Sequence, residues 1–170
     1  MPMTRKIRNV LAAALYATLA SGVAIPAHAA IVIRDVTDPP PTFWNWGSGD
    51  IVITDSVCVG TDQSGFLARW YRIGAWGTGA GGSFFLQGPA PAAGDVLSYT
   101  VQWAWSAGQT SGTNLPPLTW QIAFMNPSLD LNCQTAGVNA TVIVTIPQAD
   151  LLAAPAGVYT GTLYLIVAPL

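Results

Sequence analysis

Carboxylates are the main candidate catalytic groups in this sequence, because its 170 residues include eight Asp and no Glu. Two carboxylates that flank a glycosidic bond can hydrolyse it, one as the acid and the other as base or nucleophile. The single histidine is His28 and no lysine follows Lys6, so acid–base work farther along the chain would rest on Asp, Tyr or Arg. Five of the eight instead stand at predicted turns or segment ends, where a carboxylate bonds the local backbone: Asp35, Asp38, Asp50, Asp62 and Asp95. We therefore predict that the protein is not an enzyme and uses neither metal nor cofactor.

A glycine-rich segment at 77–82 (GTGAGG) matches the G-x-G-x-x-G pattern of a dinucleotide-binding turn. That turn needs a helix after it, because the helix N-terminus holds the pyrophosphate. The next residues, 83–87 (SFFLQ), favour a strand. The segment is therefore predicted to be a hairpin loop.

The seven tryptophans raise the question of sugar binding, since an exposed aromatic ring can stack on a carbohydrate. Trp103 and Trp105 are two residues apart and so lie on one face of a predicted strand. Tyr99 and Val101 share that face, which is typical of a core stripe. We therefore predict that both tryptophans are buried.

The first residues have the three parts of a secretory signal peptide. Three cations within the first eight residues precede an apolar run at 10–20 and an Ala-His-Ala pattern at 27–29. The run is too short to span the roughly 30 Å of bilayer hydrocarbon, which argues against a membrane anchor. We expect 1–29 to be removed by cleavage before Ala30.

Charge is scarce, since 8% of the residues are charged and 51% are hydrophobic. Beyond the predicted signal peptide, three Arg stand against eight Asp, a formal net charge of −5. A nucleic-acid partner bound through a basic face is therefore excluded.

Two cysteines, Cys58 and Cys133, remain in a chain predicted to reach an oxidising compartment, where a disulfide is the expected state. The bond would close a loop of 75 residues. In the chain-entropy model, such a bond stabilises the fold by roughly 4 kcal/mol.

The rest of the sequence predicts an all-β sandwich, because alternating apolar and polar residues recur between Gly, Pro, Asn and Ser clusters. A short helical turn is predicted only at 148–153. The predicted strands are 51–59, 66–76, 83–87, 98–105, 118–124, 140–146 and 158–167.

The start of the predicted mature chain stands apart from this pattern. A short β-prone segment that contains Ile31, Ile33 and Val36 is separated from the next strand by three prolines at 39–41, which cannot donate to a central ladder. The Pro-rich part ends in Phe-Trp-Asn-Trp at 43–46, whose two tryptophans, Trp44 and Trp46, could cover the end of the sandwich or contact an adjacent subunit. We divide the mature chain into an N-terminal extension at 30–46 and a β-sandwich domain at 47–170.

The last predicted strand of the sandwich has an uncovered edge. The last predicted strand runs almost to Leu170, and no further strand follows to cover its neighbouring edge. We therefore expect an open apolar groove that the N-terminal segment could fill. Filling within the same chain would give a closed module, whereas filling a neighbour would build a filament.

Five segments of the predicted mature chain are CV at 58–59, YRI at 71–73, GSFFL at 82–86, LSYTV at 97–101 and AGVYTGTL at 156–163. Together they resemble bacterial chaperone–usher pilins, most of all the fimbrial and spore-coat-U-like subunits. The closing pattern Pro-Ala-Gly-x-Tyr-x-Gly-Thr-Leu is the most specific part. The penultimate residue, Pro169, departs from the aromatic residue found there in many pilins.

The resemblance implies an incomplete immunoglobulin-like sandwich that is completed by a donor strand. It also implies a periplasmic chaperone that lends a strand, and an outer-membrane usher at which the N-terminal extension of the next subunit replaces it. On this basis the donor side chains are Ile31, Ile33 and Val36. The acceptor edge and the C-terminal motif comprise Gly157, Tyr159, Leu163, Leu165 and Val167.

The function expected from these features is that of a structural subunit of a surface fimbria. The chain would pass through the periplasm and end in an extracellular fibre, with neighbouring pilin subunits as partners. The alternative is a secreted carbohydrate-binding or adhesive module that completes its own sandwich. A surface glycan is a candidate partner in either case.

Overall fold

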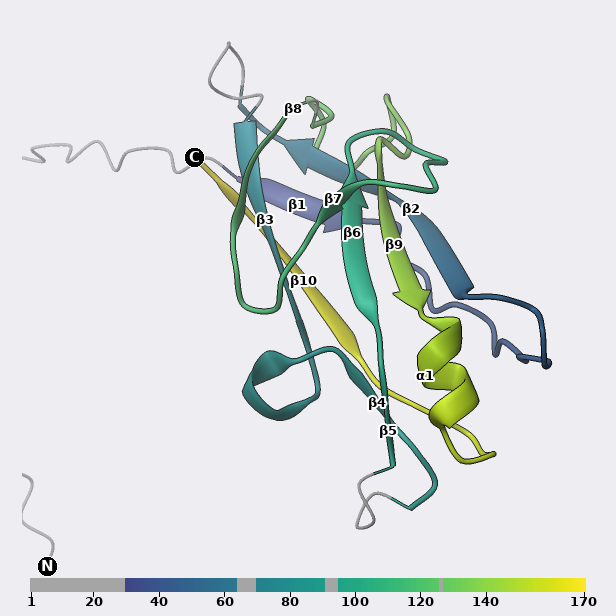
Figure 1. The fold of residues 1–170 in the computed structure, drawn as a ribbon. Helices are drawn as coiled ribbons and strands as arrows, with labels where there is room; N and C mark the ends of the chain where they lie inside the picture. The colour runs from purple at the N-terminus through teal and green to yellow at the C-terminus, as the bar shows by residue number, and fades with distance from the viewer. Residues whose placement is uncertain (1–29, 64–69, 91–94, 126) are drawn as a thin grey trace, which may run out of the picture.

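The computed structural model describes residues 30–63, 70–90, 95–125 and 127–170, so the predicted signal peptide lies outside the described residues. The chain folds as an all-β sandwich, and every pair of named strands is antiparallel (Figure 1). The first sheet is ordered β1 (Ile31–Arg34), β2 (Ile51–Thr61), β9 (Ala140–Ile146), β6 (Thr100–Ala104) and β7 (Thr113–Asn114). The second is ordered β10 (Leu163–Pro169), β3 (Trp70–Gly77) and β8 (Gln121–Met125). A hairpin of β4 (Phe85–Gln87) and β5 (Val96–Ser98) and the helix α1 (Gln148–Ala153) complete the named elements.

Six of the named strands follow the order of an immunoglobulin-like domain. The order β1-β2-β9-β6 corresponds to the A-B-E-D sheet, and β10-β3 corresponds to F-C in the facing sheet. The last strand, G, would lie beside β10, and no strand in the described part of the chain occupies that place.

The core between the sheets is built from the alternating residues of the strands. Trp103 and Tyr71 are almost fully buried and pack edge to face, with ring centroids 6.5 Å apart. The Trp103 Nε1–H donates to the Tyr71 hydroxyl at 3.2 Å. Val101, Ile73 and other small or branched residues fill the space around this pair.

Burial raises the pKa of Tyr71 to about 12, from an ordinary value near 10. Above pH 10 the unfolded chain therefore loses this proton more readily than the folded chain, so Tyr71 contributes stability that is present below pH 10 and lost as pH rises toward 12. A shift of this size corresponds to about 3 kcal/mol. We expect the free energy of unfolding, measured with denaturant from pH 9 to 12, to fall less steeply in Tyr71→Phe than in the wild type. Equal slopes would contradict the assignment.

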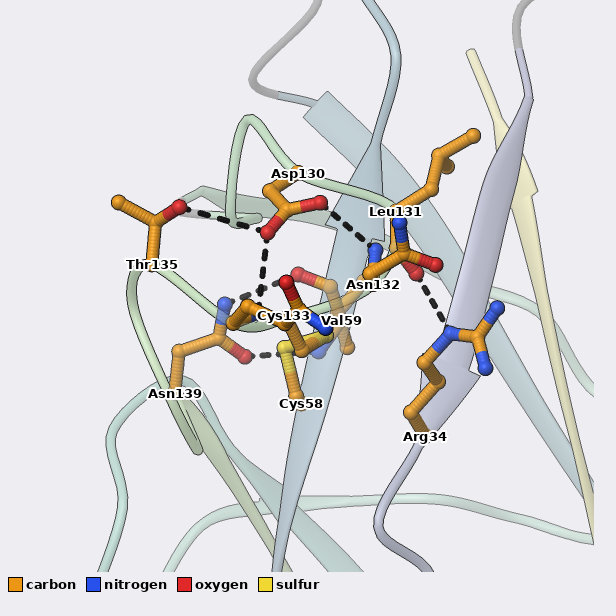
Figure 2. The surroundings of a disulfide bond; sticks show 10 residues. Arg34, Cys58, Val59, Asp130, Leu131, Asn132, Cys133, Thr135 and Asn139 are labelled. Carbon is orange, nitrogen blue, oxygen red and sulfur yellow. Dashed lines mark hydrogen bonds between the residues drawn. A yellow bond between two sulfur atoms is a disulfide. The ribbon is translucent and has the colours of Figure 1, made fainter.

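Cys58 of β2 and Cys133 of the β8–β9 loop form a disulfide, with Cα atoms 6.2 Å apart (Figure 2). The Asp130 carboxylate accepts backbone hydrogen bonds from Asn132 at 2.8 Å and Gln134 at 2.9 Å, which shape the loop around the bond. These donors, that of Asn132 foremost, hold the pKa of Asp130 below its usual range. The cross-link therefore joins the first sheet to an ordered loop.

Three expectations from the alternation pattern are wrong. The strand predicted at 158–167 begins only at Leu163. Trp103 is buried as predicted, but β6 ends at Ala104 and Trp105 is 56% exposed. The strand predicted from residue 118 begins at Gln121, because Leu118 has a left-handed backbone (φ 56°) and is exposed. In each case the alternation of apolar and polar residues in the sequence extends beyond the observed strand.

Candidate functional site

The outer edge of β10 has no paired strand among the described residues. All seven residues of β10 are in register with β3, from Leu163 opposite Gly77 to Pro169 opposite Tyr71. No described strand pairs with the opposite edge of β10. Its backbone groups on that side are therefore available to a further strand.

Leu163, Leu165 and Val167 alternate along β10 and pack against the core, yet each is only half-buried. The residues between them face outward, and Tyr164 stacks on Trp76 of β3 with ring centroids 5.6 Å apart. The predicted acceptor residues thus share the core-facing side of one strand. An additional strand would bury these side chains further. Each Å² of apolar surface removed from water stabilises the folded protein by about 25 cal/mol.

The N-terminal segment is not detached but belongs to the first sheet. β1 pairs with the end of β2 in the same chain, from Ile31 opposite Thr61 to Arg34 opposite Cys58, and it lies beside β10 without pairing to it (Figure 1). Ile31 and Ile33 are half-buried against the core. We call the side of the sandwich bounded by the end of β2 and by β10 the open side. In this structure it holds the chain's own β1.

Val36 does not join the other two predicted donor side chains. Asp35 has a left-handed backbone (φ 61°) and follows the last residue of β1, so the strand stops before Val36 is reached. Val36 is 55% exposed and differs in parity from Ile31 and Ile33. The break in the alternating pattern at Asp35 therefore coincides with the end of β1.

Polar contacts fasten both ends of β1. At the start, the Ala30 N–H donates to the Asp62 carboxylate at 2.8 Å, and the Thr61 hydroxyl donates to the Ala30 carbonyl at 3.0 Å. Beyond the end, the Thr37 backbone N–H and hydroxyl donate to the two Asp55 carboxylate oxygens at 2.9 and 2.7 Å. Sequence reasoning assigned Asp62 only to a turn and gave Asp55 no role, because no local pattern reveals a partner 32 or 18 residues away.

The linker at 35–50 exposes two aromatic side chains almost completely. Phe43 is 89% exposed and Trp46 is 86% exposed. Trp44 is half-buried instead, and its Nε1–H donates to the Gly49 carbonyl at 2.8 Å. Trp44 therefore closes a local turn, a role that was not predicted from the sequence, whereas Trp46 is exposed to solvent.

The part of the C-terminal motif that precedes Leu163 positions β10. A Cβ on Gly157 would lie 2.5 Å from Pro89 Cγ, so only glycine fits against the segment after β4. The Tyr159 hydroxyl donates to the Pro155 carbonyl at 2.8 Å, and Thr160 exchanges two backbone hydrogen bonds with Gln87. This segment therefore fixes the point at which the chain enters β10.

Five of the described carboxylates accept hydrogen bonds from other groups of the fold: Asp50, Asp55, Asp62, Asp130 and Asp150. Asp50 accepts from the Gln148 N–H at the start of α1 at 2.8 Å, and Asp150 accepts from the Ser98 hydroxyl. Within the described ranges, no group of three or more His, Cys, Asp or Glu residues is placed to hold a metal ion. The glycine-rich segment leads through a 3-10 turn at Ala80–Gly82 into β4 and not into a helix.

No helix among the described residues is long and apolar enough to cross a bilayer. No protein-family model matches the sequence, and no curated protein matches it. A solved structure of a chaperone–tip adhesin complex in CFA/I fimbriae biogenesis contains a similar chain, with a TM-score of 0.47 and 15% sequence identity. The match covers 84% of this chain and 42% of that chain, so this chain spans less than half the length of that chain. The fold assignment therefore rests on the strand order of the chain itself.

Proposed function

We propose that this protein is a structural subunit of a surface fimbria and that it takes up a β-strand from a neighbouring subunit on its open side. The observation that carries the proposal is the unpaired outer edge of β10 together with the half-buried Leu163, Leu165 and Val167. A strand added there gains backbone hydrogen bonds along the edge and covers apolar side chains on one face, which is how β-strand addition achieves both affinity and specificity.

The donor in this proposal is β1 of the next subunit. In its own chain, β1 must stop at Asp35 so that the linker can return to β2, whereas a strand from a neighbour has no such constraint. The linker at 35–50 reaches up to roughly 50 Å at about 3.3 Å per residue, well beyond the ~14 Å radius of gyration expected for a domain of this size. Exchange of an identical element between subunits is a low-cost route to assembly, because the apolar side chains that β1 exposes on leaving its own chain are covered again in the next.

The pilin resemblance supports the remaining parts of the proposal: a secretory signal peptide, a periplasmic chaperone, an outer-membrane usher and a final place in an extracellular fibre. Cleavage before Ala30 would turn its nitrogen into an ammonium group. The hydrogen bond to Asp62 would then be charge-assisted, which roughly doubles the strength of such a bond. Processing would thus favour a docked β1 until a neighbour replaces it.

A fused second strand tests the proposal. Residues 30–170 followed by a Gly-rich turn and a second copy of 30–38 should melt at least about 5 °C higher than residues 30–170 alone and should not polymerise, because the added strand can run back along β10. The matched control carries Asp in place of both isoleucines of the fused copy and should melt like the parent. If the unmodified fusion also melts like the parent and the parent stays monomeric, the open side is already complete.

That second outcome would favour the alternative function, a self-complete adhesive module. The specific observation in its favour is that β1 pairs with β2 of the same chain. Such a module would be a stable monomer without a chaperone.

A further inference from the structure

A hollow lies between two loops at the end of the sandwich where β6 ends and β9 begins. It has a volume of about 360 Å³, within the range of small-molecule sites. The β6–β7 loop and the β8–β9 loop supply its lining: Trp105, Ser106, Ala107, Pro127, Ser128, Ala136 and Asn139. We call it the Trp105 hollow. It is separate from the open side, since its Ser128 and Asn139 bond the edge of β2 opposite β1.

The indole of Trp105 is 56% exposed at the wall of this hollow. It also borders a second, smaller hollow of about 100 Å³ beside Gln109 and Ser111. A large aromatic side chain left exposed at a concave surface commonly marks a contact site, because its ring offers apolar area at little cost in conformational entropy.

The loop that carries Trp105 is held in place by hydrogen bonds to β9 and β2. The Thr141 hydroxyl, which is fully buried, donates to the Ser106 carbonyl at 2.7 Å and accepts from the Gln109 N–H at 3.2 Å. The Gly108 N–H donates to the Ser56 hydroxyl at 3.1 Å. This wall is therefore formed before any ligand arrives, which lowers the entropy cost of binding.

The facing wall is fixed to β2. The Asn139 amide bonds both backbone groups of Val59, at 2.8 and 2.9 Å, next to the Cys58–Cys133 disulfide (Figure 2). The Ser128 N–H donates to the Val59 carbonyl at 2.7 Å, and its carbonyl accepts from the Thr61 N–H at 2.8 Å. Both walls are thus anchored on the first sheet.

The Ser128 hydroxyl is the polar group in this wall that the fold does not use. It is buried and has no hydrogen-bond partner among the residues that the structure describes, while Ser128 as a whole is 5% exposed. A buried hydroxyl without a partner destabilises the fold, so a ligand that satisfies it gains affinity. Rotation about the single side-chain torsion of serine can turn the oxygen toward the hollow.

The chemistry of the lining selects the class of ligand. None of the described lining residues is charged, which favours a neutral molecule. An indole face, an unused hydroxyl and short polar side chains together match a ring with an apolar face and hydroxyls at its rim. We propose that the Trp105 hollow binds a neutral pyranose ring, stacked on Trp105 and hydrogen-bonded by Ser128, as the terminal sugar of a glycan would be.

Saturation-transfer NMR on the full processed chain tests this proposal with the methyl glycosides of glucose, galactose, mannose and N-acetylglucosamine. At least one should bind, and its affinity should fall at least about tenfold in Trp105→Ala. Trp46→Ala is the matched control, because it removes an even more exposed indole far from the hollow in sequence, and it should bind like the wild type. N-acetylneuraminic acid, an anionic sugar, should bind more weakly.

Ser128→Ala separates a binding role from a structural one. It should lower affinity about threefold to tenfold while leaving the melting temperature unchanged or higher, because it removes a hydroxyl that the fold leaves unpaired. No binding of any neutral glycoside at ~10 mM, or equal affinity in Trp105→Ala and the wild type, would overturn the proposal.

Discussion

Ile33→Asp should abolish fibre formation and leave the sandwich folded. Ile33 lies in the middle of β1, opposite Val59, with its side chain half-buried against the core. A carboxylate there would need to be desolvated without a partner, which costs several kcal/mol whether β1 lies on its own chain or on a neighbour. The disulfide and the core pair of Trp103 and Tyr71 lie outside β1, so the rest of the domain should remain intact.

Electron microscopy of fibres and co-purification with the chaperone would measure this result. We expect the variant to bind the chaperone but to yield no fibres. Val36→Asp is the matched control, because Val36 belongs to the same segment, is 55% exposed and lies outside β1, so fibres should persist. Normal fibres from Ile33→Asp would remove this residue from the donor strand.

Loss of the disulfide should destabilise the domain by about 4 kcal/mol, because the bond spans 75 residues and restricts the unfolded chain. That is a large part of the 5–15 kcal/mol typical of a whole domain. Denaturant unfolding of a protein with both Cys58→Ala and Cys133→Ala, compared with the oxidised wild type, measures the loss.

Reduction of the wild type by dithiothreitol is the control for side-chain packing, since Cys58 is fully buried and alanine is smaller. The reduced wild type and the double variant should lose similar amounts of stability. A loss below about 1 kcal/mol in both would show that the unfolded chain is already restricted in other ways.

A strand that pairs with the same neighbouring strands along its whole length can be predicted from the sequence. The pattern at 140–146 coincides with β9, and the helical turn at 148–153 coincides with α1, because each is a single alternating or helical run bounded by a turn. The run around Tyr99 looked equally regular, but the chain changes partner there. Val96–Ser98 pairs with β4 and Thr100–Ala104 pairs with β9, a switch that leaves the alternation unchanged.

The candidate site was predictable in its residues but not in its arrangement. The alternation of Leu163, Leu165 and Val167 predicts a core-facing row on the last strand, and the structure contains that row. The pattern of Ile31 and Ile33 predicts a strand but cannot say which edge it pairs with, since the choice depends on Asp62 and Asp55 far along the chain. The Trp105 hollow had no sequence signal, because its walls come from two loops that meet only in the folded chain.

Because β1 is held by few interactions, it can leave the sheet without unfolding of the whole domain. Only four residues of β1 pair with β2, at the edge of the sheet, and the polar contacts beyond its end are exposed to solvent. Segments of this kind open by local unfolding, at a small fraction of the free energy needed to unfold the protein. Such openings occur on timescales of microseconds to seconds. A domain closed by a disulfide can therefore resist denaturation for long periods and still release its first strand many times in that interval.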